Sequence, residues 1–309
     1  MLTYADLNKL STTYVVPYLG GEVVRTTAGK EKREHKDSLL INGRIHCDFV
    51  QHGAETGRFS SRNPNLQNVP APHTVHGKAI RNLFFAPEGY KLVVADYSQI
   101  EPRVIASMSK DPIMLKNYLS GKDIYTTVGD TMGVDRKAGK VLVLAMAYGV
   151  GPDKISRSIG CSITEARDLL SRFGSEFSSV SSYKVKVIGA TRVSNPPCVT
   201  TILGRKRYLP ELNSNDHFLR SGAERQAFNT RIQGSAADII KLAMVRAYKR
   251  LPEGARLLLT VHDELVTLTP NDKVDDTVSA IREAMEGIDL LSVPLVADIT
   301  VVDRWGEAK

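Results

Sequence analysis

The chain has 309 residues, 42% of them hydrophobic, which is enough for one core with an inserted lobe or for two domains at roughly 150 residues each. Lys and Arg outnumber Asp and Glu by 41 to 34, and this formal charge of +7 suits a polyanionic partner without requiring one. The three cysteines lack metal-binding spacing, no apolar run approaches the ~20 residues of a membrane span, and no signal peptide is visible. These features argue against a zinc site, a disulfide framework and a membrane partner, and favour a cytoplasmic protein.

The first part of the chain mixes helix, loop and strand signals. Residues 3–14 are typical of a helix, whereas residues 20–38 contain glycine and many charges and predict an exposed loop or hairpin. The β-branched runs at residues 41–50 and 91–95 predict strands.

A block of helix signals follows in residues 111–194. Asp123 and Asp135 each stand before an amphipathic segment, and Ser162 with Glu165 three residues later forms a capping box pattern. We therefore expect a mostly helical lobe inserted between strands.

The last part of the chain returns to strands. Residues 199–209 predict a hairpin turning at Leu203-Gly204, and residues 223–251 predict one long helix. Residues 257–268 predict a second hairpin with His262-Asp263-Glu264 at its bend, and a helix follows. The mixed order indicates an α+β fold in which a sheet is backed by helices.

Two separate segments place acids at strand ends. In residues 93–103, VVADYSQIEPR, Asp96 follows a buried strand, where it could also be no more than the cap of the next helix. In residues 257–266, LLLTVHDELV, Asp263 and Glu264 stand at the hairpin bend. If the sheet brings these acids together they repel each other unless cations lie between them, and a pair of Mg²⁺ ions about 3.5–4 Å apart fits such carboxylates.

A third segment, residues 135–149, reads DRKAGKVLVLAMAYG. On a helix, the fourfold spacing of Arg136, Lys140, Leu144 and Tyr148 places them along one face at a rise of about 6 Å per step, so the two cations could follow a triphosphate. The alternative is an amphipathic core helix with two solvated cations, in which Leu144 belongs to the core.

In their order and separation, these three segments resemble motifs A, B and C of the family A DNA polymerases. Residues 56–70, TGRFSSRNPNLQNVP, resemble the segment that this family places near the primer terminus, and residues 199–210 and the helix from Ala223 resemble it further. The resemblance implies a hand-like polymerase core with an antiparallel palm sheet, inserted helical fingers and most of the thumb absent. It assigns residues 1–110 and 196–309 to the palm and residues 111–195 to the fingers.

The resemblance also implies a role for each matching residue. Asp96 and Asp263 would ligate two Mg²⁺ ions, with Mn²⁺ as a substitute, while Glu264 and His262 would shape the primer end. Lys140 would neutralise or protonate the leaving pyrophosphate. The implied dNTP-binding residues are Gln99, Glu101, Tyr125, Arg136, Lys140, Leu144 and Tyr148, with Glu101 and Tyr148 excluding a ribose 2′-hydroxyl. The implied DNA-binding residues are Arg58, Asn65, Gln67, Asn68, Arg225, Asn229, Gln233 and His262.

Three positions depart from the family pattern. Leu144 stands where Phe or Tyr is usual, Tyr125 where many members have a phosphate-contacting His, and Pro102 where an apolar residue follows the motif A glutamate. None of the three removes an expected metal ligand.

The implied activity is primer extension with dNTPs on a DNA template, in replication or repair, within a bacterial or phage-infected cell. We expect no proofreading on this chain, and a separate chain could supply the thumb, an exonuclease or other replication functions. Two alternatives stay open: an inactive DNA-binding or assembly subunit, and a single-subunit RNA polymerase. A reverse transcriptase is disfavoured because no YxDD-like turn is present.

Overall fold

The computed structural model describes residue 8, residues 10–27 and residues 30–308, and its centre is a four-stranded antiparallel sheet. The strand order is β10 (Arg256–Val261), β11 (Glu264–Pro270), β7 (Tyr90–Tyr97) and β12 (Ala297–Val302). The hairpin predicted at residues 257–268 and the strand predicted at residues 91–95 are therefore confirmed. The edge strand β12 was not predicted.

Side chains alternate across this sheet, and both of its faces are buried. Val93 and Ala95 of β7 point to a core shared with helices α12 (Ser235–Arg250) and α13 (Val274–Glu286), whereas Leu92 and Val94 point to the other face. That second core contains Trp305 and side chains from the first 80 residues. A strand with apolar residues on both faces is held rigidly, so the end of β7 is a firm support for a site.

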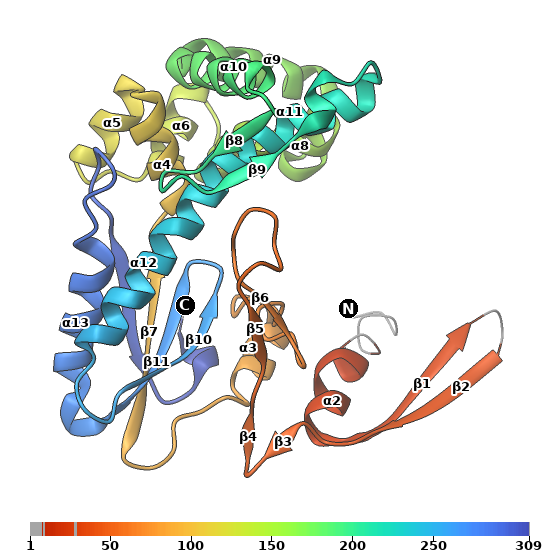
Figure 1. Cartoon of the computed structure of the whole chain (residues 1–309), viewed down its shortest axis with the longest axis vertical. Coiled ribbons are helices and arrows are strands. Elements are labelled where there is room, and N and C mark those ends of the chain that lie inside the picture. Colours follow the sequence, from red (N-terminus) through yellow and green to blue (C-terminus); the bar gives the residue numbers. More distant parts are fainter. Residues whose placement is uncertain (1–7, 9, 28–29, 309) are drawn as a thin grey trace.

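The predicted helical lobe is confirmed and lies at one end of the sheet (Figure 1). Helix α4 (Ile100–Ser109) leads into it from β7. The lobe consists of α5 (Pro112–Leu119), α6 (Ile124–Met132), α7 (Arg136–Tyr148), α8 (Pro152–Ile159), α9 (Ile163–Glu176) and α10 (Ser178–Val193). Asp123 and Asp135 cap α6 and α7, and Ser162 with Glu165 forms the predicted capping box at α9.

The segment between the helical lobe and α12 contains a hairpin and a long helical run. Strands β8 (Cys198–Thr200) and β9 (Lys206–Tyr208) form the predicted hairpin. After η2 (Pro210–Asn213), helix α11 (His217–Asn229) begins earlier than predicted because Asp216 caps it, and it passes through a π-helical turn, η3 (Thr230–Gly234), into α12. The predicted long helix at residues 223–251 is therefore present as one helical run, but the run begins earlier, at His217, and contains a π-helical turn.

The N-terminal segment is made of short elements. The predicted helix at residues 3–14 lies partly outside the described residues; within them, η1 (Ser11–Val15) and α2 (Val16–Leu19) are helical. Residues 20–38 form the hairpin of β1 (Gly21–Thr27) and β2 (Lys30–Lys36). Short strands and one helix follow: β3 (Leu40–Ile41), β4 (Arg44–Ile45), β5 (Asp48–Val50), β6 (Ser60–Arg62) and α3 (Val75–Arg81).

The strand predicted at residues 41–50 is divided into β3, β4 and β5. Asn42 and Gly43 both have positive φ, 51° and 72°, and turn the chain back on itself between the first two of these strands. Two short 3₁₀ turns complete the sheet lobe, η4 (Asn271–Lys273) and η5 (Trp305–Glu307).

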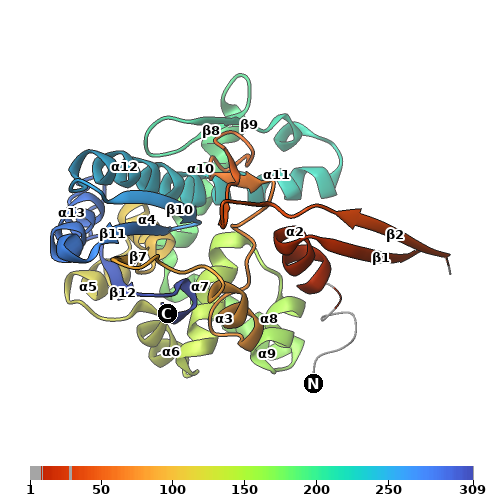
Figure 2. The same ribbon diagram turned by 90° about the horizontal axis from the view of Figure 1, so that it is seen from below.

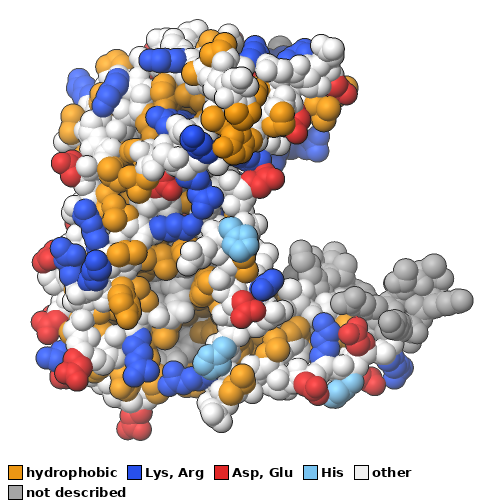
Figure 3. All heavy atoms as spheres, in the orientation of Figure 1, with side chains coloured by type: hydrophobic (Ala, Val, Ile, Leu, Met, Phe, Trp, Pro, Cys, Tyr) orange, Lys and Arg blue, Asp and Glu red, His pale blue; other side chains and the backbone are white. Residues whose placement is uncertain are grey.

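Together the two lobes enclose an open hollow with Lys and Arg side chains on its surface (Figure 3). The view from below shows α12 and α13 on one side of the sheet, and the β1–β2 hairpin projecting away from it on the other (Figure 2). Among the described residues, no helix has the length and apolar character needed to cross a membrane.

Candidate active site

Three acids meet at one end of the central sheet. Asp96, near the end of β7, lies directly opposite Glu264, the first residue of β11, and the Tyr97 amide donates to the carbonyl of Asp263 at 3.3 Å. The bend before them is sharp, because His262 adopts a left-handed conformation with φ 57°. On the other side of β7, Asp298 of β12 also lies opposite Asp96, and it was missed because the strand that carries it was not predicted.

Asp263 is part-buried beside one cation and a second acid. A single nitrogen of Arg58, Nη2, lies 2.7 Å from Glu101 Oε1 and 3.4 Å from Asp263 Oδ1. Burial raises the pKa of Asp263 to about 6; Arg58 opposes the rise and Glu101 adds to it. A carboxylate in this position is stabilised when a further cation is bound.

Glu264 is held from the opposite side. Trp305 Nε1 donates to its Oε1 at 2.9 Å, and Arg81 Nη1 lies 3.7 Å from its Oε2. Burial raises the pKa of Glu264, while Arg81 and the bond from Trp305 lower it. Both carboxylate oxygens therefore have partners in the second core, and these partners could not be inferred from the sequence because η5 and α3 lie far from β11 along the chain.

Arg58 is positioned by tight packing of the loop between β5 and β6. Gly57 has φ +85°, and a Cβ atom there would lie 2.6 Å from Arg205 Nε. At Gly234, in the π-helical turn, a Cβ atom would lie 2.6 Å from Thr201 Cγ2 and 3.1 Å from the Thr56 carbonyl. The loop, the β8–β9 hairpin and the long helical run thus lock together beside the acids.

Glu101 links this loop to the helical lobe. Its second oxygen accepts a short hydrogen bond from the hydroxyl of Tyr148, at the end of α7. Gln233 also hydrogen-bonds the Tyr148 side chain. Burial, followed by the charge of Glu101, raises the pKa of Tyr148, so it is a neutral donor. The predicted proximity of Glu101 and Tyr148 is therefore present in the fold.

The first turns of α7 present two cations above a buried tyrosine. The Arg136 guanidinium lies 5.5 Å and the Lys140 ammonium 5.8 Å from the ring centroid of Tyr125 on α6. Both cations are exposed, and Leu144, one turn after Lys140, is only half-buried. The core face of α7 is formed instead by Ala138, Gly139, Leu142, Val143, Ala145 and Ala147. The four residues spaced by four therefore follow the open side of the helix.

Gln99 connects the acids to the helical lobe. It lies between β7 and α4 with φ 58°, donates to Asp123 at 2.5 Å and accepts from Tyr118 at 3.2 Å. Gln99 is predicted to contact a nucleotide, but both polar atoms of its side-chain amide already have a partner, Asp123 for the nitrogen and Tyr118 for the oxygen.

The residues predicted to contact DNA come from two parts of the chain, the segment around β6 together with the bend at His262, and the long helical run. Gln67 is buried and donates to the Thr260 carbonyl at 3.0 Å, while Asn65 accepts from the amides of Gln67 and Asn68 at 3.0 and 3.2 Å. These bonds shape the turn, and they leave the Asn65 and Asn68 side chains exposed. On the long helical run, Arg225 is exposed and Asn229 and Gln233 are half-buried, and His262 is exposed at the bend before β11.

The donor set at the sheet end is suited to Mg²⁺. Within the described ranges, no group of three or more His, Cys, Asp or Glu side chains is arranged so that it could hold a metal ion by itself. Asp96 is exposed and Asp263 is part-buried, so their hard oxygen ligands fit an ion that shares its coordination with water and substrate oxygens. The raised pKa of Asp263 is consistent with a ligand position that a cation stabilises.

Comparison with known proteins agrees with this geometry. The family model described as DNA polymerase family A matches residues 1–307. The thermostable DNA polymerase I of Thermus filiformis is 38% identical over 319 aligned residues, and the DNA polymerase I of Deinococcus radiodurans is 34% identical over 322; each alignment covers 100% of this chain, but 36% and 31% of the relative. The chain thus spans about a third of the length of these relatives.

A solved structure has the same fold. The POL domain of Pol1 from M. smegmatis, in complex with DNA primer-template and dNTP, superposes with a TM-score of 0.82 and 36% identity, covering 87% of this chain and 49% of that one. The described structure is accordingly a mixed α+β fold like that POL domain. The chain belongs to DNA polymerase family A.

Proposed function

We propose that this chain extends the 3′ end of a DNA primer with dNTPs, as directed by a DNA template. One observation carries the proposal. The acids where β7 ends and β11 begins lie beside the Arg58–Glu101–Tyr148 network. Tyr148 is the last residue of α7, the helix that also presents Arg136 and Lys140. The DNA primer-template and dNTP in the M. smegmatis complex support it. In this reading residues 1–110 and 196–309 are the palm and residues 111–195 are the fingers.

Asp96 and Asp263 would hold two Mg²⁺ ions. When bound, such ions neutralise charge on phosphate oxygens and activate the attacking primer hydroxyl. The sheet supplies the spacing of the two ligands, since Asp96 stands on β7 and Asp263 in the turn that leads directly into the paired strand β11. Glu264 would lie next to these two ligands and help to shape the primer end, with its carboxylate held by Trp305 and Arg81.

Arg136 and Lys140 would bind the triphosphate. Their heads are exposed and lie on the open side of α7, where both can form charge-assisted bonds to phosphate oxygens. Lys140 would neutralise or protonate the leaving pyrophosphate. Tyr125, whose ring lies beneath both cations, would hold them in place.

Glu101 and Tyr148 would exclude ribonucleotides. The Glu101 side chain is 9% exposed and fixed by Arg58 and Tyr148, so it cannot move aside to accommodate a 2′-hydroxyl without breaking two bonds. Leu144, one turn before Tyr148, would pack against the incoming sugar.

The two edges of the hollow would hold the primer-template duplex. Arg58 and His262 would contact the primer end, with Asn65, Gln67 and Asn68 on the same edge. Arg225, Asn229 and Gln233 would contact the duplex from the long helical run. The Lys and Arg side chains on the surface of the hollow favour binding of a polyanion (Figure 3).

A primer-extension assay tests this function. We expect the purified chain to extend a primed DNA template with dNTPs and Mg²⁺, to stop when EDTA is added, and to use rNTPs poorly. DNA binding without extension would indicate an inactive subunit, and efficient rNTP use would indicate an RNA polymerase.

A further inference from the structure

The Arg136 guanidinium is held in a defined orientation by the carboxylate of Asp123. We propose that Asp123 is the positioning residue that pre-orients Arg136 for the triphosphate, an inference that rests on the proposed function. Asp123 and Arg136 are the residues at which α6 and α7 begin, because Asp123 caps α6 and Arg136 is the first residue of α7.

The contact between them is a two-point ion pair. Arg136 Nε lies 2.7 Å from Asp123 Oδ2, and its Nη2 lies 3.4 Å from Oδ1. A guanidinium has five N–H donors in one plane, so this pair fixes the plane and leaves three donors for another anion. The Arg136 side chain is 60% exposed against 28% for Asp123, so the cation is the more accessible of the two partners.

Asp123 is itself held firmly. Its Oδ2 accepts from the Thr126 amide at 3.1 Å and from the Thr126 hydroxyl at 2.8 Å, and its Oδ1 accepts from Gln99 at 2.5 Å. Gln99 accepts in turn from Tyr118 at 3.2 Å. Because Gln99 lies three residues after Asp96, this chain of bonds ties the orientation of Arg136 to the strand end that carries the acids.

The same bonds indicate whether loss of the Asp123 charge weakens or strengthens nucleotide binding. A carboxylate near a triphosphate could compete for the arginine, but Asp123 occupies only two of its five donors, and an exposed arginine otherwise has many rotamers to lose on binding. Pre-orientation lowers that cost, so loss of the Asp123 charge should weaken nucleotide binding. In agreement with tight engagement, the pKa of Asp123 is lowered: burial raises it, but the bonds from Arg136, Thr126 and Gln99 outweigh burial.

The test compares two capping aspartates. Asp123→Asn and Asp123→Ser keep a residue type that caps a helix, but lose the charge that holds Arg136. Asp135→Asn is the matched control, because Asp135 caps α7 next to Arg136 through the Ala138 amide at 2.7 Å. The dNTP affinity is measured by formation of a ternary complex on a dideoxy-terminated primer-template, and KM and kcat by single-nucleotide incorporation.

We expect both Asp123 variants to weaken dNTP binding and raise KM about tenfold, the size expected for loss of a charge-assisted hydrogen bond, with kcat within about twofold of wild type. Asp135→Asn should leave affinity and KM within about twofold. Unchanged or tighter dNTP binding in both Asp123 variants, with thermal unfolding like that of wild type, overturns the inference.

A double-mutant cycle with Arg136→Ala separates this inference from the proposed function. If Asp123 acts through Arg136, Asp123→Asn should have no further effect on dNTP affinity once Arg136 is replaced, whereas additive effects contradict such a role. Weakening by Arg136→Ala together with no effect of Asp123→Asn overturns the positioning role alone. No effect of Arg136→Ala on dNTP affinity overturns both that role and the assignment of Arg136 to the triphosphate.

Discussion

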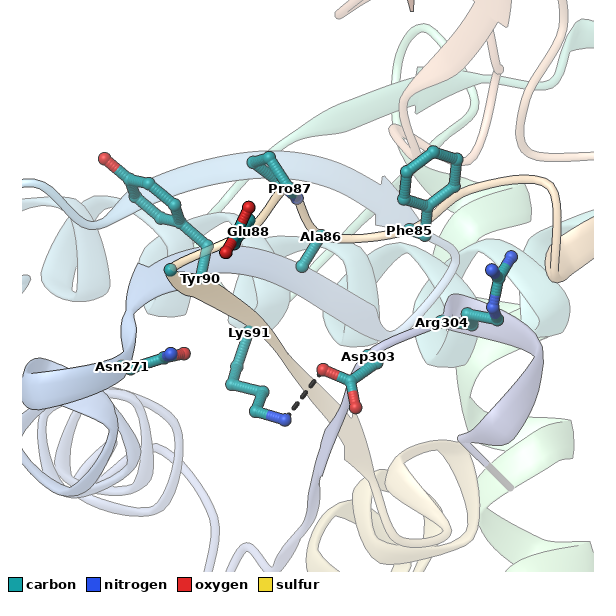
Figure 4. Close-up of a pocket in the computed structure, with 10 residues that line it drawn as sticks. Phe85, Ala86, Pro87, Glu88, Tyr90, Lys91, Asn271, Asp303 and Arg304 are labelled. Atoms are coloured by element: carbon teal, nitrogen blue, oxygen red, sulfur yellow. Dashed lines mark hydrogen bonds and ion pairs between the residues drawn. The ribbon is translucent and has the colours of Figure 1, made fainter.

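The two ends of β7 carry charges in opposite ways. Near its start, Lys91 lies 2.7 Å from Asp303 in a surface hollow of about 270 Å³, and Asp303 is 64% exposed (Figure 4). Near its end, Glu101 is 9% and Asp263 30% exposed, and the two acids share one guanidinium nitrogen of Arg58. The first end is a balanced pair in water, whereas the second is a part-buried group with more negative than positive charge.

The difference shows why acids without full compensation, rather than the number of charges, mark the site: Asp263 is part-buried and its pKa is raised to about 6, although Asp96 is exposed. An exposed ion pair contributes only about 0–1 kcal/mol to stability, because water solvates the two separated charges nearly as well as they solvate each other. A buried acid without full compensation destabilises the fold, so its presence points to a ligand that completes it. We therefore place the proposed metal site at the end of β7 and not at its start.

The largest expected effect is on catalysis. Asp96→Ala or Asp263→Ala should lower single-turnover incorporation by several orders of magnitude, because each variant loses a proposed metal ligand and its stabilisation of transition-state charge. Asp303→Ala, directly after strand β12 of the same sheet, should leave incorporation within about twofold. Near-normal incorporation by either Asp96→Ala or Asp263→Ala would remove the distinction between the two ends.

The next effect is on sugar selectivity. Glu101→Ala should raise rNTP use relative to dNTP roughly tenfold or more, with some loss of overall rate, because the side chain that Arg58 and Tyr148 hold in place is removed. The ratio of kcat/KM for the two substrates measures it. An unchanged ratio would mean that another side chain excludes the 2′-hydroxyl.

A third effect is on stability and its pH dependence. The pKa of Asp263 is raised to about 6 in the folded chain. Between the unfolded value near 4 and this folded value the native state binds a proton that the unfolded chain does not, so stability falls as pH rises through this window.

Asp263→Asn removes the cost of holding an ionised, part-buried carboxylate at position 263 in the folded chain. In metal-free buffer at pH 7.5, the variant should be more stable than wild type by about 1 to 3 kcal/mol, and the gain should vanish near pH 4. Lys91→Ala, at the exposed end, should change stability by less than about 1 kcal/mol at either pH. Urea unfolding at the two pH values measures both, and a gain for Asp263→Asn that is the same at both pH values would contradict burial of a charge.

The sequence predicted those features that depend on neighbouring residues. The caps at Asp123, Asp135 and Ser162 and the bend at His262 are local, so residue type and spacing were sufficient for them. The start of α11 is also local, and Asp216 was the signal that could have found it.

Features that depend on distant contacts could not be predicted in the same way. Strand β12 is a half-exposed edge strand whose identity comes from pairing with β7, and the bonds of Glu264 to Trp305 and Arg81 join three remote segments. Asp123 was interpreted only as a cap, because its bonds to Arg136 and Gln99 exist only in the folded chain.

The smallest expected effect concerns Leu144, on the open side of α7. Leu144→Phe should speed incorporation about five- to tenfold, worth about 1 kcal/mol, because a flat ring packs on the sugar better than a branched side chain does. Leu144→Tyr should also relax discrimination against dideoxynucleotides, since its hydroxyl can replace the missing 3′-hydroxyl. Single-turnover rates with dNTP and ddNTP measure both, and equal rates and preferences in all three proteins would place Leu144 away from the substrate.

The most direct test of the difference between the two ends is metal binding itself. Mn²⁺ can be titrated by electron paramagnetic resonance into complexes of wild type, Asp96→Ala, Asp263→Ala and Asp303→Ala with a dideoxy-terminated primer-template and dNTP. We predict tight Mn²⁺ binding by wild type and Asp303→Ala and its loss in both Asp96→Ala and Asp263→Ala. Equal Mn²⁺ binding by all four proteins would contradict a metal site at the point where β7 ends and β11 begins.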